Sequence, residues 1–182
     1  MNRIRGPKLR LLSALLFVLL IATGGPSEAQ PDDVAMLTPF KADRVVVLKG
    51  ERRLVLMRGD RVLKVYRVAL GRYPKGHKTR KGDAKTPEGT YTIDYRLDSD
   101  RSKFYRALHI SYPNDRDRAS AAARGVHPGG QIMIHGLPTN WSAKDVGHPK
   151  LDWTQGCIAL TNREMDEVWQ MVSDGTRIEI HP

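Results

Sequence analysis

The sequence reads His-Gly-Leu-Pro at residues 135–138 and Thr-Gln-Gly-Cys-Ile-Ala-Leu at residues 154–160, and these two segments decide the fold and chemistry that we expect. Cys157 is the only cysteine among the 182 residues. His135 ends the apolar run 132–134, which is typical of a buried strand. A lone thiol and a histidine held by a strand are the two parts of a cysteine nucleophile with its general base. The remaining sequence must therefore provide a fold that brings them together.

Strand patterns precede and follow these two segments. In addition to the run that ends at His135, β-branched or alternating runs between turn residues predict strands at residues 44–48, 54–57, 62–70, 90–95, 105–112 and 176–181. A long connection at residues 71–89, rich in glycine and lysine, interrupts them. Loops of this length tend to carry function or disorder. Its lysines are therefore candidates for contact with an acidic substrate, or they simply solvate the loop.

One firm helix is predicted after the second segment. Thr161 and Glu164 have the spacing of a capping box, in which each residue satisfies the other at the start of a helix. Apolar residues follow at i, i+3, i+4 and i+7, which is one helix face. They are Met165, Val168, Trp169 and Val172. Gly175 is expected to end this helix.

A second, shorter helix is predicted at residues 114–125, which are polar and then rich in alanine. Asn114 or Asp115 can cap its start, and Gly125 can end it. Strands nevertheless dominate the chain. The predicted fold class is therefore mainly β (α+β), a β-sandwich-like domain with one helix in the C-terminal region and a short helical insertion.

The N-terminal residues have the layout of a secretory signal peptide. A basic start is followed by an uncharged apolar run at residues 11–22 and a small-x-small site at residues 27–29. The apolar run is short for a membrane span, which needs about 20 residues, and an uncleaved anchor is the alternative. We expect a signal peptide at residues 1–29, a lead-in segment at 30–42 and one domain at 43–182. The domain is expected to be exported to the periplasm and to meet the membrane only through the transient signal peptide.

The charge of the chain is basic. The signal peptide contains four of the 30 Lys and Arg and one of the 20 Asp and Glu, which leaves 26 against 19, or +7. Nucleic acid is the first partner to consider for such a charge, but export and the lack of a stacking-aromatic or groove-helix motif argue against it. An anionic extracytoplasmic polymer or membrane surface fits better. A soluble and merely basic surface is the simpler alternative.

The single cysteine cannot form an internal disulfide, so Cys157 is either buried and inert or kept for its reactivity. A histidine within hydrogen-bond reach can take the thiol proton, and Gly156 lets the backbone approach closely. The N–H groups of Gln155, Gly156 and Cys157 are candidates for binding the oxyanion of a tetrahedral intermediate. These parts predict acyl transfer on an amide through a thioester, with water or an amine as the acceptor.

A metal site is the competing interpretation of these residues. His127, His135, His148 and Cys157 are separated by 8, 13 and 9 residues. These spacings match no compact zinc motif. We therefore predict no metal and no cofactor.

Several short motifs occur along the chain in a recognisable order. His135-Gly136 is followed by Thr154, Gly156, Cys157 and Ile158. Upstream matches lie at Gly71, Pro74, residues 82–83, residues 86–89, Tyr91, residues 112–114 and residues 130–135. This pattern resembles the L,D-transpeptidase catalytic domain of the YkuD type, which acts on bacterial peptidoglycan. The resemblance runs from about Asp43 to His181 and implies that residues 43–182 are a catalytic domain of this kind.

The resemblance implies a role for each matching position. Cys157 corresponds to the family's nucleophile, His135 to its general base, and Gly136 to a position that helps orient the histidine. Two positions depart from the pattern, because Gln155 replaces the usual histidine and Ala159 the usual arginine. Gln155 can donate a hydrogen bond but cannot titrate. The loss of the arginine removes a bidentate partner for a carboxylate.

Residues around the cysteine are expected to contact the substrate. Trp153 and His148 lie in the loop before it and can shape the cleft, with a structural role as the alternative. Thr154 and Ala159 flank the Gly-Cys pair, and we expect specificity to be decided where the chain departs from the family, at Gln155 and Ala159. A branch of the family with Trp-Thr-x-Gly-Cys-Ile-Ala resembles this chain. It includes members that join or detach an outer-membrane lipoprotein at a diaminopimelate residue.

The function that the resemblance implies is that of an exported cysteine acyltransferase. Cys157 would attack the diaminopimelate carbonyl of a tetrapeptide stem and displace D-Ala, and an amine would resolve the thioester in cross-linking or protein attachment. One alternative is an L,D-hydrolase or amidase, in which water resolves the thioester. The other is a cell-wall-binding module without catalysis. The expected partners are peptidoglycan peptide stems and an outer-membrane lipoprotein, and not nucleic acid.

Overall fold

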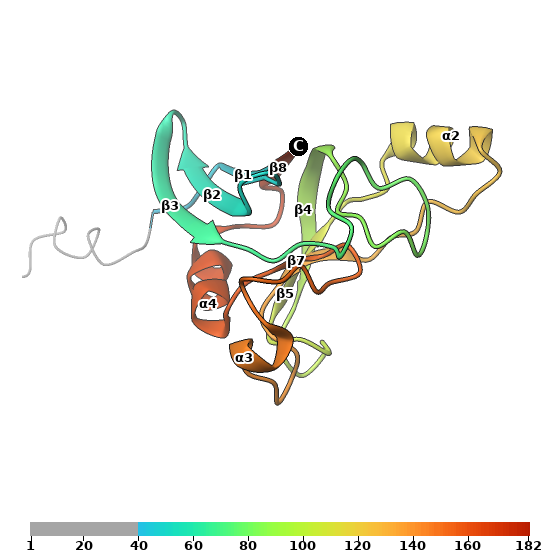
Figure 1. Cartoon of the computed structure of the whole chain (residues 1–182). Coiled ribbons are helices and arrows are strands. Elements are labelled where there is room, and N and C mark those ends of the chain that lie inside the picture. The colour runs from blue at the N-terminus through green and yellow to red at the C-terminus, as the bar shows by residue number, and fades with distance from the viewer. Residues whose placement is uncertain (1–39) are drawn as a thin grey trace, which may run out of the picture. The chain divides into compact units, whose positions relative to one another are not determined.

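The structure is a computed structural model that describes residues 40–182 (Figure 1). The expected signal peptide at residues 1–29, and the lead-in segment up to residue 39, lie outside the described residues. The strands are β1 (Arg44–Leu48), β2 (Arg53–Arg58), β3 (Arg61–Arg67), β4 (Gly89–Leu97), β5 (Ala107–Ile110), β6 (Ile132–His135), β7 (Ile158–Ala159) and β8 (Arg177–His181). The helices are α2 (Asp115–Ala123), α3 (Ala143–Val146) and α4 (Asn162–Met171). None of these helices combines the length and apolar character that a membrane span needs.

The strands form one eight-stranded sheet in the order β3-β2-β1-β8-β4-β5-β6-β7, which confirms the prediction of a mainly β fold. Figure 1 shows β3, β2, β1 and β8 together at one end of this order. The long strand β4 joins the two halves, because residues 89–92 pair with β8 while Ile93, Arg96 and Leu97 pair with β5. The register shifts between Ile93 and Arg96, which is the kind of irregularity that bends a strand. The two halves of the expected sandwich are therefore parts of one bent sheet.

The third predicted strand, residues 62–70, is too long at its C-terminal end. β3 ends at Arg67, and the chain then leaves β2 to bond with the segment that leads into β7. The backbone groups of Ala69 and Ala159 exchange two hydrogen bonds of 3.1 and 2.8 Å, and Thr154 N donates to Leu70 O at 3.1 Å. Residues 69–72 therefore cover the open edge of β7. Residue patterns within one strand cannot show this change of partner, because it depends on a segment some 90 residues away along the chain.

The core lies on one face of the sheet and is closed by α4. The predicted capping box is confirmed, since Thr161 Oγ1 accepts from Glu164 N and Glu164 Oε2 accepts from Thr161 N at 2.9 Å. The predicted apolar face of α4 packs into the core, with Trp169 only partly buried. Gly175 does not end this helix. Its last residue is Met171, and Gly175 N donates to Ile93 O at 2.7 Å in the turn before β8.

The short helical insertion is α2, and Asn114 is its cap. Asn114 Oδ1 accepts from Asp117 N at 3.1 Å, and Gly125 lies beyond the helix with a φ of +63°. Asp117 is buried and accepts a hydrogen bond from Tyr91 Oη at 3.0 Å. Polar contacts hold α2 in place, since the helix has little apolar surface. The one-turn helix α3 was not predicted, although the Ser142 to Asp145 spacing is that of a capping box.

The capping box of α4 gives a first prediction. Replacing Thr161 with Ala removes the acceptor for Glu164 N and should lower the free energy of unfolding by about 1 kcal/mol. Urea denaturation followed by circular dichroism measures this difference. Thr161→Ser keeps the hydroxyl and is the matched control. An equal loss in the Ser and Ala variants would contradict the assignment, because the methyl group and not the cap would then carry the stability.

Candidate functional site

The two parallel strands β6 and β7 place Cys157 and His135 on the same side of the sheet. Ile134 lies opposite Ile158, His135 lies opposite Ala159, and both isoleucines belong to the core. Successive side chains of a strand point to opposite faces. His135, and Cys157 just before β7, therefore lie on the face away from the core, two positions apart along adjacent strands. The fold thus brings together the two residues that the sequence singled out.

The turn before Cys157 is held by Thr154. Thr154 Oγ1 donates to Cys157 O at 2.8 Å and accepts from Gly156 N at 3.0 Å. Gly156 has a φ of +132°, and a Cβ added there would lie 2.6 Å from the Lys85 carbonyl oxygen. Only glycine fits this position without a backbone shift.

This turn corrects two expectations. The Gly156 N–H was a candidate oxyanion donor, but it is already bonded to the Thr154 hydroxyl. Thr154 itself is buried, at 4% exposure, and its hydroxyl holds the turn, so that it presents little surface to a substrate. Gln155 is exposed at the tip of the turn, where a backbone N–H can meet a ligand.

The thiol of Cys157 is partly exposed, and Sγ lies 3.6 Å from Gln131 O, to which the S–H donates. Burial of the sulfur raises the pKa of the Cys157 thiol above its usual value. A hydrogen bond with the Met133 backbone and the positive charge of Lys78 act in the opposite direction. The net pKa shift is upward, so the resting side chain is a thiol at neutral pH.

His135 is fully buried, and its two ring nitrogens differ. Nδ1 lies 2.6 Å from Gly136 O. A carbonyl oxygen only accepts, so Nδ1 carries the proton and Nε2 keeps its lone pair. Among residues 40–182, Nε2 has no hydrogen-bond partner. Burial lowers the pKa of His135 to about 4, with a small contribution from His148 in the same direction, so the imidazole is neutral and free to accept a proton.

The Gly136 carbonyl accepts the hydrogen bond from His135, and the lack of a side chain at Gly136 is required. A Cβ added at Gly136 would lie 2.6 Å from Tyr105 O and 2.8 Å from Asn162 Oδ1. The Gly136 N–H donates to Tyr105 O at 2.9 Å. The Gly136 carbonyl that orients His135 is therefore fixed by the segment just before β5 and by the start of α4.

An aromatic wall encloses the imidazole. Phe104 stacks on His135 with ring centroids 3.8 Å apart, and Trp153 meets the same ring edge-on at 5.7 Å. Phe104 and Trp153 also line a cavity of about 480 Å³ together with Trp141 and the cations Arg72 and Lys103. Trp153, which we expect to shape the substrate cleft, therefore lies in the wall of this cavity. The sequence did not identify Phe104 as part of this site, because a single aromatic residue in a loop gives no local indication of such a contact.

Two further expected contacts are not available in this structure. Ala159 is fully buried, and its backbone is bonded to Ala69, so it offers no surface to a substrate. His148 is also buried, at 7% exposure, and neither of its ring nitrogens has a partner in the described part of the chain. Burial lowers the pKa of His148, while the charge of Glu164 acts in the opposite direction. Within residues 40–182, no group of three or more His, Cys, Asp or Glu side chains is arranged to hold a metal ion.

Residues 42–180 match the L,D-transpeptidase catalytic domain family, YkuD. The chain is 27% identical over 176 residues to the Escherichia coli (strain K12) protein "Putative L,D-transpeptidase YafK". This match covers 91% of the chain but 64% of the relative, so the chain spans less than two thirds of that protein's length.

Three solved structures of bacterial proteins are similar to this chain in fold. The helical cell shape determining protein Pgp2 of Campylobacter jejuni is 25% identical, with a TM-score of 0.59 over 76% of this chain and 46% of Pgp2. Bd1075 of Bdellovibrio bacteriovorus is 23% identical, with a TM-score of 0.54 over 78% of this chain and 48% of Bd1075. An L,D-transpeptidase of Mycobacterium smegmatis is 16% identical, with a TM-score of 0.51 over 76% and 58%.

The buried neutral His135 gives a prediction for stability against pH. The unfolded chain binds a proton at this residue below about pH 6.5, whereas the folded protein binds it only below about pH 4. Lowering the pH through this range therefore favours the unfolded chain, by about 3 kcal/mol for the full shift. Urea denaturation of the wild type should show this loss as the pH falls from 6.5 to 4.

The matched variant is His135→Gln, which cannot titrate. This variant should lose most of the dependence of stability on pH between pH 6.5 and 4. His148→Gln should remove a smaller part, since the charge of Glu164 opposes the effect of burial on the pKa of His148. Wild type and His135→Gln with the same slope would show that the imidazole is not held neutral by burial.

Proposed function

The chain belongs to the L,D-transpeptidase catalytic domain family of the YkuD type, and we propose that it is an exported cysteine acyltransferase that acts on peptidoglycan peptide stems. The observation that carries this proposal is the placement of Cys157 beside a buried, neutral His135 whose Nε2 has no partner among residues 40–182. A nucleophile and a base on one face of adjacent strands are what acyl transfer requires. Export rests on the layout of residues 1–29.

The proposed reaction begins at the diaminopimelate residue of a tetrapeptide stem. The Cys157 sulfur forms a bond with its carbonyl carbon, and His135 Nε2 takes the thiol proton. The tetrahedral intermediate collapses, the carbon–nitrogen bond to D-Ala breaks, and the proton on Nε2 passes to the departing amine. An incoming amine then attacks the thioester, gives its proton back through His135, and releases the thiol.

The state of the pair decides when the proton moves. Because burial raises the pKa of the Cys157 thiol and lowers that of His135, the resting pair is neutral and not a thiolate with an imidazolium. The S–H points to Gln131 O in the resting structure, so we propose that it turns toward Nε2 as the substrate arrives. Proton transfer then accompanies attack, which is general base catalysis.

The oxyanion and the rest of the stem need partners as well. Since Thr154 already binds the Gly156 N–H, we propose the N–H groups of Gln155 and Cys157 as the oxyanion donors. The cavity beside His135 supplies an aromatic surface, with Trp141 exposed, for the apolar parts of the peptide. Arg72 and Lys103 at its wall supply the positive charge that the carboxylates of a stem would meet, since Ala159 cannot.

The likeness to Pgp2, which is described as a helical cell shape determining protein, supports a role in shaping the cell wall. A bond made or broken between stems changes how the polymer can be extended. We therefore place the proposed activity in peptidoglycan remodelling. An outer-membrane lipoprotein is the second proposed acceptor. This proposal rests on the resemblance of residues 153–159 to the family branch with Trp-Thr-x-Gly-Cys-Ile-Ala.

The proposal is tested by mass spectrometry of the intact protein after incubation with a disaccharide-tetrapeptide. We expect a covalent adduct on Cys157 that corresponds to the stem without D-Ala. Cys157→Ser should give no thioester, and His135→Gln should form the adduct about a hundredfold or more slowly, which is the usual contribution of a general base.

The products of the reaction distinguish the transferase, the hydrolase and the binding module. An adduct that passes to an added amine or stem supports the transferase, whereas an adduct released only by water makes the protein a hydrolase. The absence of any adduct in the wild type, together with retained binding to cell-wall sacculi, would leave a binding module and reject the enzyme.

A further inference from the structure

A β-bulge in β4 lies opposite one histidine of β5. The register shifts between Ile93 and Arg96, where three steps along β4 match two steps along β5. Asp94 and Tyr95 therefore both lie opposite His109. Bulges are common next to active sites, where they re-aim side chains. This bulge directs two side chains to one imidazole.

Both residues of the bulge contact the His109 ring. His109 Nδ1 lies 2.6 Å from Asp94 Oδ1, and the Tyr95 ring stacks on the imidazole with centroids 4.3 Å apart. His109 is buried, whereas the Asp94 side chain is 40% exposed. The bond to the imidazole uses Oδ1, which leaves the lone pairs of Oδ2 for another donor, whether the imidazole carries one proton or two. The result is a partly exposed carboxylate that is held in a fixed place.

The imidazole lies on the outer face of the sheet, level with the cysteine. Leu108 and Ile110 belong to the core, so His109 between them points to the opposite face. His109 pairs with Met133 of β6, and the register of β6 against β7, continued by one residue, places Met133 opposite Cys157. Neighbouring strands lie about 4.8 Å apart, so the backbones at His109 and Cys157 are separated by about 10 Å across β6.

Tyr95 also joins the bulge to the cysteine through direct contacts. Tyr95 Oη donates to Gln131 Oε1 at 3.4 Å, and the Gln131 carbonyl oxygen accepts from the thiol at 3.6 Å from Cys157 Sγ. Gln131 has a φ of +57°, which is uncommon for a residue with a side chain. The residue that holds the resting thiol is therefore itself held by the bulge of β4.

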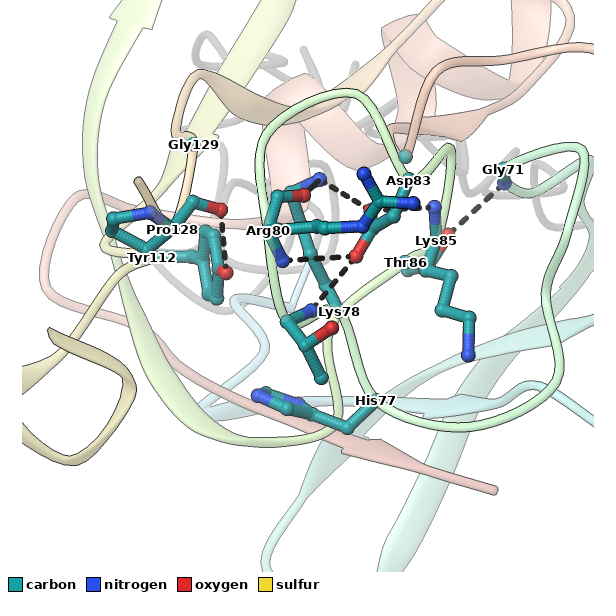
Figure 2. A network of polar contacts seen from close by, with 12 residues as sticks. Gly71, His77, Lys78, Arg80, Asp83, Lys85, Thr86, Tyr112, Pro128 and Gly129 are labelled. Atoms are coloured by element: carbon teal, nitrogen blue, oxygen red, sulfur yellow. Dashed lines mark hydrogen bonds and ion pairs between the residues drawn. The ribbon is translucent and has the colours of Figure 1, made fainter. Parts of the chain in front are cut away.

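A second carboxylate near the cysteine turn is already fully bonded. Asp83 belongs to the loop of residues 71–89, and its side chain is 7% exposed. Its two oxygens accept from Lys78 Nζ at 2.8 Å and from three backbone N–H groups of the same loop (Figure 2). A carboxylate has about four lone-pair sites, so these bonds use all of them. Asp94, in contrast, keeps an oxygen for a ligand.

We propose that Asp94, held by His109 and Tyr95, is a specificity residue that binds the side-chain ammonium group of the acyl-donor residue. The inference rests on the proposed function, in which Cys157 attacks a diaminopimelate carbonyl. The side chain of diaminopimelate ends in a second amino group, which is positively charged. When the side chain is extended, this nitrogen lies about 7 Å from the attacked carbonyl carbon, and a hydrogen bond adds about 3 Å. The sum is of the same size as the separation across β6.

The outer face then carries opposite charges on the two sides of the cysteine. The cavity with Arg72 and Lys103 lies past the C-terminal end of β6, at Pro138. Tyr95 reaches the chain just before the N-terminal end of β6. Cations on one side suit the carboxylates of a stem, and Asp94 on the other side suits its ammonium group. This division of charge fixes the direction in which a stem lies across the site.

The test is the affinity of two tetrapeptide stems for the Cys157→Ser protein, measured by isothermal titration calorimetry. One stem has lysine at its third position, and the other has norleucine, which lacks the ammonium group. We expect the lysine stem to bind about tenfold more tightly, because a hydrogen bond to a charged group contributes on this order. Equal binding of the two stems, or binding of neither, would overturn the proposal. This comparison leaves Asp94 unchanged, so it can overturn the proposal even where a variant of Asp94 does not fold.

Asp94→Asn in the same background assigns the preference to this carboxylate. Asparagine keeps an oxygen for the His109 bond but loses the charge, so the lysine stem should bind only as tightly as the norleucine stem. Asp100→Asn removes a negative charge from an exposed position beyond β4 and should keep the tenfold preference. A folded Asp94→Asn protein that still prefers the lysine stem would contradict the assignment. Because binding is measured without acylation, a missing acyl adduct would reject the proposed function and leave this result standing.

Discussion

Ile134 and Ile158 face each other on two parallel strands, and both side chains are fully buried. This pair sets the register of β6 against β7, and the register decides where Cys157 and His135 lie. A slip of one residue would turn Cys157 toward the core and bring Ile158 to the outer face. The alternation of apolar residues around the cysteine therefore both fills the core and turns the Cys157 side chain to the outer face.

Backbone contact is the second constraint. Gly71 and Gly156 approach so closely that a Cβ on Gly71 would lie 2.2 Å from Ala84 O and 3.0 Å from Gly156 Cα. The edge of β7, the end of β3 and the loop of residues 71–89 therefore meet at points where only glycine fits. Asp152 fixes the same junction, because it accepts from Leu70 N at 2.9 Å and binds the Arg52 guanidinium. The long loop is thus part of the wall around the cysteine, and not only a solvated excursion.

Local sequence patterns predicted most of the strands and helices, but they did not predict the long-range contacts. Alternation and capping residues identify the core strands and α4, since both signals lie within a few residues of each other. Cys157 stood out because it is the only cysteine in the chain, and His135 because it ends an apolar run. Phe104 stacking on His135 and the burial of Ala159 depend on segments that are distant along the chain. The sequence also could not show that the Gly156 N–H is already bonded, because this depends on where the Thr154 hydroxyl lies.

Burial acts on both members of the proposed catalytic pair, Cys157 and His135, in the same direction, toward the uncharged form. It raises the pKa of the Cys157 thiol and lowers that of His135, so the two effects together separate the resting state from the ion pair. A site of this kind needs charge stabilisation that is fixed in advance, because packed protein groups cannot reorient as water does. The N–H groups of Gln155 and Cys157, proposed as the oxyanion donors, meet that requirement, because Thr154 holds the turn that carries them. The loop of residues 71–89 forms the wall of this turn, since Lys85 O lies 2.6 Å from the place where a side chain at Gly156 would begin. The contacts that hold the fold together therefore also fix the proposed donors.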